Sequence, residues 1–411
     1  MLFTPLKDCT ALLLLLLKEG AGGGQSKTML ILKVMQSHTD PSPALPAKRG
    51  GSNTIGLTKK VIFILLVFTG IAHSQSLLHV ADSIRQLHHI PELGYAIVSS
   101  DSILEMNVLG VKKVGTSMKG ELKDKFRLGS NTKTITAFIA VLLAKEGKIS
   151  LDTKFFDLYP ELIATSRPEF RHVTLLELLS FRTQLFPYTY TDSLPLKSQF
   201  SGSEEKQRYQ FAQWFFAQPP NVARTLYHFS NLDYVAAALM LEKASGKPYK
   251  QLVTELGEKL NIHFDFGQPN MIDANEPWGH DASLRPEPPG DPYKLNWLLS
   301  AGNITMDLPN FARFIQIHLA GLNGRKSLLD CADFNSLHYG LPGFAIGWFW
   351  AKDKKGNVYS YHEGNPGTFL SRAYLYKKAN RAYILFCNVQ SDEAEEGLDE
   401  LMEVMRKKIV K

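Results

Sequence analysis

The feature that most constrains this chain is a serine and a lysine three residues apart at the start of an apolar helix. Ser130 and Lys133 follow the short extended segment 126–129. Residues three apart at a helix start share a face, so the amine is within reach of the hydroxyl. A lysine removed from water can take the proton from a serine hydroxyl, which is otherwise a poor nucleophile. The helix is predicted by the spacing of its apolar residues and by a glycine at its end: Ile135, Phe138, Ile139, Leu142, Leu143 and Gly147.

This spacing is not sufficient alone, because a serine before an apolar helix most often caps the helix N-terminus. About one or two S-x-x-K pairs are expected by chance in a chain of 411 residues. A second pair, Ser203 and Lys206, lies in the polar stretch 202–208 with no apolar run behind it. We therefore interpret Ser203 as a surface residue, and Ser130 as either a nucleophile or a helix cap.

Two later segments carry residue types that would complete a site around Ser130. Residues 229–231, Phe-Ser-Asn, precede a second apolar helix predicted over 234–242. Residues 362–364, His-Glu-Gly, follow an extended run. In this order, the segments resemble the S-x-x-K, Y-x-N or S-x-N, and K-T-G or H-x-G motifs of the serine β-lactamase and penicillin-binding superfamily. The similarity is greatest to its branch of class C β-lactamases, D-aminopeptidases and esterases, and it covers about residues 77–406.

The resemblance implies a role for each matching residue. Ser130 would attack an acyl carbon and form an acyl-serine, and Lys133, held by Asn231, would accept or relay the proton. His362 would lie on the strand at the edge of the cleft, as a fourth catalytic residue. Gly364 would let the backbone approach the substrate, and the N–H groups of Ser130 and Asn365 would form the oxyanion hole.

The second motif departs from the family pattern at Phe229, where the branch has a tyrosine. Phenylalanine cannot exchange a proton, so activation of the nucleophile and protonation of the leaving group would need another residue. Tyr227 and His228 are candidate substitutes, and Lys133 acting alone is a third possibility. Phe229 itself would then only line the substrate site. A second departure is the segment 181–184, Phe-Arg-Thr-Gln, where the branch usually has H-T-S-G.

The third motif bears on the substrate class. A lysine at position 362 would bind the carboxylate of a β-lactam or a D-alanyl terminus, whereas a histidine is neutral near pH 7 unless perturbed. The alternative for His362 is a structural histidine bonded to a backbone carbonyl. We expect the substrate to be an ester, a D-amino-acid amide or peptide, or a β-lactam-like compound. It would be a small molecule or a peptide, and the cell wall is one candidate source. The competing expectation is a catalytically impaired relative that binds cell-wall peptides, for which Phe229 is the main support.

The order of predicted elements indicates an α+β fold. A helix over 77–87 and a hairpin of strands 95–99 and 103–109 come first, and strands 345–350, 358–361, 371–376 and 382–389 with a helix over 392–408 come last. We therefore expect an antiparallel sheet of N- and C-terminal strands flanked by helices, as in the β-lactamase/transpeptidase-like fold. The α/β part would be 77–125 and 320–411, and an inserted, mainly helical part would be 126–319, within a single hydrolase domain over 75–411.

Composition and charge add the remaining expectations. Residues 1–75 carry most of the formal net charge of +6, so the folded part has no basic surface suited to nucleic acid. Lys59-Lys60 and the apolar run 61–72 fit a signal peptide over 59–74, which indicates an exported, periplasmic or extracellular protein. An uncleaved segment 61–72 would instead be a membrane anchor, although it is short for one. Residues 1–58 are interpreted as a disordered or mistranslated extension, and no metal site or cofactor motif is apparent.

Overall fold

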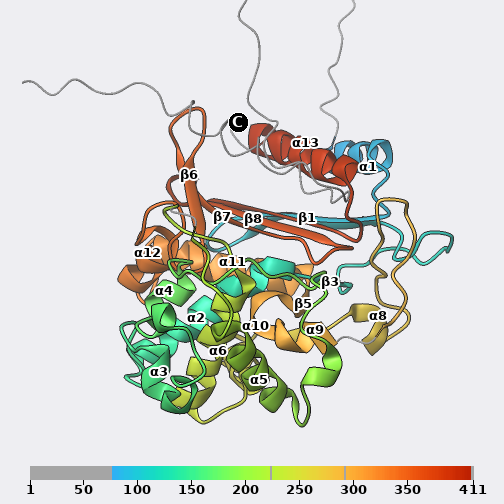
Figure 1. Ribbon diagram of the computed structural model, residues 1–411. Coiled ribbons are helices and arrows are strands. Elements are labelled where there is room, and N and C mark those ends of the chain that lie inside the picture. Colours follow the sequence, from blue (N-terminus) through green and yellow to red (C-terminus); the bar gives the residue numbers. More distant parts are fainter. Residues whose placement is uncertain (1–75, 223–224, 291–292, 409–411) are drawn as a thin grey trace, which may run out of the picture. The chain divides into compact units, whose positions relative to one another are not determined.

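The computed structural model describes residues 76–222, 225–290 and 293–408. Its main sheet has six antiparallel strands in the order β2-β1-β9-β8-β7-β6. Strand β1 pairs with β9 although almost the whole chain separates them, so the first hairpin and the last strands form one sheet (Figure 1). The strands are β1 Glu92–Val98, β2 Ile103–Gly110, β6 Phe349–Lys352, β7 Val358–Gly364, β8 Leu370–Tyr376 and β9 Arg381–Cys387.

Both faces of this sheet are covered, and alternation along β9 divides its side chains between two cores. Ala382, Ile384 and Phe386 point into the large core shared with the inner helices. Tyr383, Leu385 and Cys387 point into a smaller core on the opposite face. Helices α1 (Leu77–Leu87) and α13 (Asp392–Lys408) pack together over that second face, whereas α11 (Leu308–Leu322) contacts β1, β8 and β9 from the first (Figure 1).

The inner layer is mainly helical and contains a small second sheet. Helices α2 (Thr132–Lys145), α6 (Asn231–Ser245) and α10 (Leu299–Gly302) contact one another at its centre. The second sheet has the order β3-β5-β4, with strands β3 Lys125–Arg127, β4 Asp265–Phe266 and β5 Ile304–Asp307. The remaining helices are α3 Phe155–Leu158, α4 Leu175–Leu179, α5 Glu204–Phe216, α7 Tyr249–Leu260, α8 Pro269–Ile272, α9 Tyr293–Trp297 and α12 Cys331–Tyr339.

The segment that carries Ser130 is a tight turn between two of these elements. Strand β3 pairs with β5, and a 3-10 turn over Gly129–Asn131 then leads into α2. Nearly every residue of α2 from Thr132 to Leu143 is buried, since the helix runs through the centre of the inner layer. This environment fixes the start of α2 and the serine before it.

The α+β class and the pairing of N- and C-terminal strands predicted from the sequence are confirmed. The prediction of a strand over 345–350 was wrong. The N–H of Ala345 donates to the carbonyl of Trp348 (2.9 Å), and Gly347 between them has φ +81°, so this segment is a turn and β6 begins at Phe349. The small sheet in the middle was not predicted, because strands of two to four residues are too short to show an alternating pattern.

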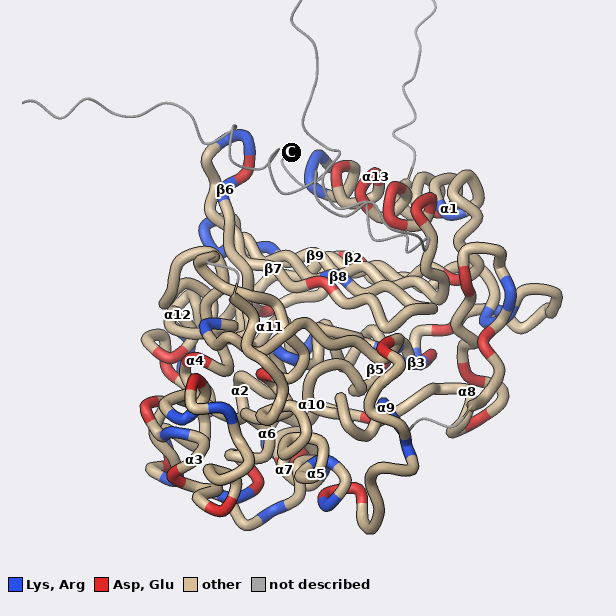
Figure 2. The backbone as a smooth tube through the Cα atoms, viewed as in Figure 1, with Lys and Arg blue, Asp and Glu red and all other residues tan. Residues whose placement is uncertain are grey.

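Charged residues of both signs are mixed on the outer helices and loops of the described part (Figure 2). Cys331 and Cys387 are both free thiols, and Cys387, at the end of β9, is buried. None of the helices in the described ranges is long and apolar enough to span a bilayer. The predicted extension 1–58 and signal peptide 59–74 lie outside the described residues.

Candidate active site

Ser130 and Lys133 are in direct contact at the start of α2. The Nζ of Lys133 lies 2.9 Å from the Oγ of Ser130. Ser130 is half-buried, whereas the side chain of Lys133 is fully buried. Asn131 precedes α2 and no side chain caps the helix, so the alternative role of Ser130 as a helix cap does not describe this structure. Ser203, in contrast, caps the exposed helix α5 through a bond from the N–H of Lys206 to its Oγ (3.3 Å).

The amine of Lys133 has two further hydrogen-bond partners, and both are oxygen atoms that can only accept a hydrogen bond. Its Nζ donates to the Oδ1 of Asn231 and to the carbonyl of Ala301, each at 2.7 Å. Burial lowers the pKa of Lys133 well below its usual range, because the charged form loses its hydration. A neutral amine has two N–H donors and one lone pair. In that form, with both donors directed to Asn231 and Ala301, the lone pair would face the O–H of Ser130, whereas the charged form donates to the Oγ of Ser130 as well.

The orientation of the Asn231 amide is fixed by the loop behind it. Its Nδ2 donates to the carbonyl of Tyr188 at 2.7 Å, so the Oδ1 must face Lys133. Asn231 is the first residue of α6, and the preceding Ser230 caps that helix through the N–H of Leu232. The structure thus brings the predicted residues Ser130, Lys133 and Asn231 together.

The Phe229 ring lies beside the amine of Lys133 and carries no polar group. Its ring centroid is 4.8 Å from the Nζ of Lys133, and the ring packs on Phe181 at 4.9 Å. The two suggested substitutes are turned elsewhere. Tyr227 packs on Phe344 and Phe349, and the ring of His228 lies against the hydroxyl of Thr225. Among the described residues, neither side chain makes a hydrogen bond to Ser130 or Lys133.

His362 is placed on β7 with its ring fully buried. Its Nδ1 lies 2.8 Å from the carbonyl of Gly347, which can only accept, so this nitrogen carries the proton. The ring packs against Phe344 and Phe349, and its Nε2 is buried without a partner in the described part of the chain. Burial, with the nearby Lys133 amine, lowers the pKa of His362 to about 3, so the ring is neutral near pH 7.

The end of β7 packs directly on the turn that contains the serine. A side chain at Gly364 would lie 1.9 Å from the carbonyl of Leu128 and 2.9 Å from the backbone N of Ser130. A side chain at Gly129, which has φ +50°, would lie 2.9 Å from the backbone N of Asn365. These contacts require glycine at both positions. They place the backbone nitrogens of Ser130 and Asn365 on two segments that pack directly against each other.

Sequence reasoning missed two neighbours of Lys133. One is the carbonyl of Ala301, which α10 supplies and no side-chain motif could reveal. The other is Asp233, a buried carboxyl that accepts a bond from Thr183 (2.5 Å) and whose charge acts on Lys133. Burial raises the pKa of Asp233 well above its usual range. Thr183 belongs to the segment 181–184, whose departure from the family pattern was the available signal.

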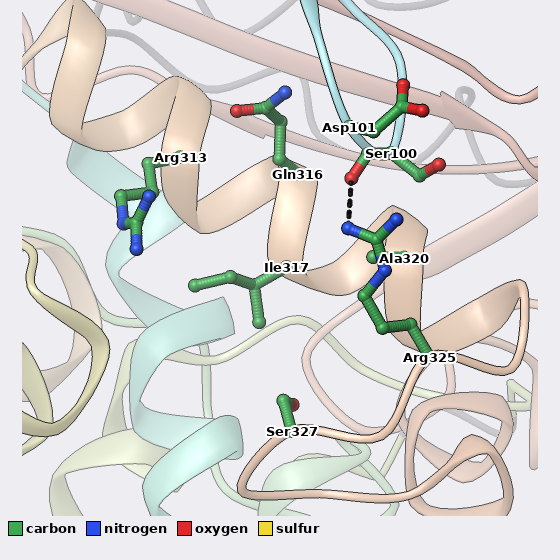
Figure 3. A pocket seen from close by; sticks show the side chains of 8 residues that line it. All are labelled: Ser100, Asp101, Arg313, Gln316, Ile317, Ala320, Arg325 and Ser327. Atoms are coloured by element: carbon green, nitrogen blue, oxygen red, sulfur yellow. Dashed lines mark hydrogen bonds between the residues drawn. The ribbon is translucent and has the colours of Figure 1, made fainter.

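A hollow of about 230 Å³ lies elsewhere, between the β1–β2 turn and α11 (Figure 3). Arg325 donates to the carbonyl of Ser100 at its rim (3.3 Å), and no residue of the Ser130 site lines it. In the described ranges, no group of three or more His, Cys, Asp or Glu side chains is arranged to hold a metal ion.

The match to a known family can now be set beside this geometry. The beta-lactamase family model matches residues 80–404. The chain belongs to the beta-lactamase family. This beta-lactamase family member is 22% identical over 313 residues to Protein flp of Staphylococcus aureus strain MW2, a match covering 75% of the chain. The match covers only 61% of the length of that relative. A shorter match, 30% identical over 99 residues, joins 24% of the chain to 26% of penicillin-binding protein 4 of Amycolatopsis lactamdurans.

Solved structures share the fold of this beta-lactamase family member. A beta-lactamase/D-alanine carboxypeptidase from Pseudomonas syringae superposes with a TM-score of 0.65 at 15% identity, over 81% of this chain and 98% of that one. The D-alanine carboxypeptidase AmpC from Burkholderia cenocepacia gives 0.62 at 16% identity, over 80% and 97%. An octameric penicillin-binding protein homologue from Pyrococcus abyssi gives 0.63 at 17% identity, over 76% and 73%. The predicted superfamily and fold are thus confirmed.

Proposed function

We propose that this protein is a serine hydrolase that works through an acyl-serine intermediate at Ser130, with Lys133 as its base. The observation that carries the proposal is the 2.9 Å contact between the Ser130 hydroxyl and a buried amine whose two other hydrogen bonds are occupied by Asn231 and Ala301. A neutral amine with one available lone pair is what an unactivated hydroxyl needs.

In the proposed reaction, the Oγ of Ser130 attacks the substrate carbonyl while its proton moves to the Nζ of Lys133. The oxygen of the tetrahedral intermediate accepts bonds from the N–H groups of Ser130 and Asn365. The bond to the leaving group then breaks, and Lys133 returns its proton to that group. Water hydrolyses the acyl-serine by the same steps. Because Phe229 has no hydroxyl, Lys133 acts as both base and acid.

The surroundings of β7 favour an uncharged substrate. His362 stands where many relatives have a lysine, and here its ring is buried, neutral and bonded to Gly347. We assign it to positioning β7 and Lys133 rather than to contact with substrate. Without a cation at this position, a substrate carboxylate gains little attraction. A neutral ester or a D-amino-acid amide fits better than a β-lactam or a D-alanyl terminus.

Phe229 is the specific observation that favours a second candidate, a relative that binds cell-wall peptides without turning them over. Neither Tyr227 nor His228 supplies the missing phenol near Lys133. Against this candidate, the Ser130–Lys133–Asn231 contacts are complete. We also propose that the protein is exported through the segment 59–74, which a fusion of residues 1–75 to a reporter enzyme would test.

A fluorophosphonate probe tests the assignment. We expect it to add one mass increment to the purified protein and expect Ser130→Ala to abolish the increment. Ser203→Ala is the matched control, since Ser203 also precedes a lysine by three residues but is exposed and caps α5. Equal labelling of the wild type and Ser130→Ala would refute the nucleophile. Incubation with p-nitrophenyl esters, D-amino-acid amides and penicillins then separates hydrolase from binder when intact mass is combined with an assay of the released acid, because only a hydrolase both acylates Ser130 and releases the product.

A further inference from the structure

A loop of seven residues, 186–192, which we name the strap, is attached to the second motif. The hydroxyl of Ser230 donates to the carbonyl of Phe186 at 2.8 Å. The side-chain amide of Asn231 donates to the carbonyl of Tyr188 at 2.7 Å. The strap therefore begins beside Asn231, the residue that holds Lys133.

Two residues after Tyr188, the strap contacts the loop that follows β7. The hydroxyl of Tyr190 lies against Gly367, so close that a side chain added at Gly367 would come within 1.7 Å of it. Gly367 follows Asn365, the proposed oxyanion donor, by two positions, and its N–H donates to the Asn365 side chain (2.9 Å). The chain from Tyr188 to Tyr190 thus joins the second motif to the loop after the third motif.

The loop that Tyr190 contacts is anchored by hydrogen bonds and an ion pair. The guanidinium of Arg127, almost fully buried, donates to the carbonyl of Pro366 at 3.4 Å and pairs with Glu287 at 3.7 Å. The hydroxyl of Thr368 donates to the same Glu287 carboxylate at 2.5 Å. The strap is fixed as well, because Lys294 donates to the carbonyls of Tyr190 (3.1 Å) and Asp192. Tyr190 is therefore a rigid contact between two anchored segments.

Burial favours a steric role for this tyrosine over a chemical one. The pKa of Tyr190 is raised by burial, which keeps the phenol protonated and unsuited to act as a base. The strap also borders an open hollow of about 400 Å³. Phe186 of the strap lines this hollow, together with Leu194 and Trp214 from outside the strap. The strap therefore lies partly at the surface, but the Tyr190 ring also packs against the large core, and Tyr190→Phe is the variant that keeps this packing.

We propose that Tyr190, because it joins the second motif to the loop that follows Asn365, limits the size of the acyl group at Ser130, so that only short acyl groups fit beside the proposed oxyanion hole. This inference rests on the proposed function and names the substrate class of the same site. Its physical basis is that a bulky aromatic side chain, held at both ends of a short loop, cannot move aside without breaking the bonds of Asn231 and Lys294.

The test compares p-nitrophenyl acetate, butyrate and octanoate, which share one leaving group. For the wild type, kcat/KM should fall steeply with acyl length. Tyr190→Ala should raise kcat/KM for octanoate at least tenfold relative to acetate, and Tyr190→Phe should behave as wild type. Thr191→Ala, at an exposed neighbour in the strap, is the control for general loosening of the loop. Rates of Ser130 labelling by short- and long-chain fluorophosphonates give the same comparison without turnover.

An unchanged octanoate-to-acetate ratio in Tyr190→Ala, with Ser130 still labelled by the short probe, would overturn this inference alone. A loss of selectivity in Tyr190→Phe equal to that in Tyr190→Ala would also overturn it, because the hydroxyl rather than the ring would then matter. Failure of every probe to label wild-type Ser130 would instead refute the proposed function.

Discussion

The amine of Lys133 lies 4.8 Å from the centroid of the Phe229 ring. An aromatic ring in this position still shields the amine from water and so helps to keep it neutral. It can also stabilise a positive charge that develops on Lys133 when Ser130 loses its proton. What the ring cannot do is transfer a proton. The Phe229 ring thus gives Lys133 an aromatic neighbour, as a tyrosine would, but it has no hydroxyl through which a proton could pass.

Replacing Phe229 by tyrosine should restore that route. The ring is 41% exposed, so a hydroxyl fits without displacing the core. General acid–base groups typically contribute about 10²- to 10⁴-fold in rate, and we expect kcat/KM for p-nitrophenyl acetate to rise toward the lower end of that range. Steady-state assays of the purified variant measure the change.

The matched control for this variant is Phe266→Tyr. Phe266 is also partly exposed, and Lys250 lies 5.8 Å from its ring, but it belongs to the second sheet and contacts no site residue. It should leave the rate unaltered. A rate for Phe229→Tyr at or below that of the wild type would mean that Lys133 or another group already performs the transfer.

The rate should depend on pH through Lys133. Its pKa is lowered by burial, and only the neutral amine accepts the proton of Ser130. The value of kcat/KM should therefore rise as pH increases through this lowered pKa and reach a plateau well below the usual lysine pKa. Lys133→Arg should be at least about 10³-fold slower at every pH, because a guanidinium stays protonated. A wild-type profile that is flat from pH 5 to 10 would exclude Lys133 as the base.

Asn231→Asp should move that profile. A carboxylate at the position of the amide oxygen, 2.7 Å from the Nζ, favours the charged amine and raises the pKa of Lys133. The acid limb of kcat/KM should shift upward by roughly one to three pH units, while the rate at high pH recovers in part. A lower rate with an unshifted limb would show instead that Asn231 acts only by holding the strap through Tyr188.

Stability should fall in acid because of a buried histidine pair. His318 Nδ1 lies 2.9 Å from His338 Nε2, and His338 Nδ1 lies 2.7 Å from the hydroxyl of Ser360 on β7. Burial lowers the pKa of His318 to about 3 and lowers that of His338 as well. Between pH 6.5 and 3 the unfolded chain binds more protons than the folded one, so the free energy of unfolding decreases as pH falls.

For His318, the expected decrease in the free energy of unfolding is on the order of 2 kcal/mol between pH 6.5 and 5, and His338 adds to it in the same direction. Urea unfolding at both pH values measures it. His318→Gln should remove about the contribution of one histidine to the pH dependence of the free energy of unfolding. His172→Gln, at an exposed position, should leave that pH dependence as in the wild type. Equal pH dependence in all three proteins would contradict this explanation.

Sequence patterns predicted the parts of this molecule that depend on local spacing. The bounds of α1 and α13 and the cores of β1, β2, β8 and β9 follow from amphipathic or alternating runs. The contact between Ser130 and Lys133 follows from their separation at a helix start. The resemblance added Asn231, which lies 98 residues beyond Lys133 and which no local spacing could have linked to it.

What could not be predicted depends on backbone groups and on distant loops. The Ala301 carbonyl gives no sequence signal, although it fixes the direction of the Lys133 lone pair. The burial of His362 depends on Phe344 and Phe349 closing over β7, which a histidine before a glycine does not reveal. Tyr190 was missed because its importance comes from contact with Gly367, 177 positions later in the chain.

The strand order of the main sheet bears on when the Ser130 site can form during synthesis. Strands β7, β8 and β9 are the last to be synthesised, yet β7 supplies the wall against which the serine turn packs, and β9 must insert between β8 and β1. Pairings between such distant segments form slowly. If Ser130 is the nucleophile, as proposed, its hydroxyl would gain reactivity only when the hairpin of β8 and β9 has docked beside β1 and β7 has closed against the serine turn.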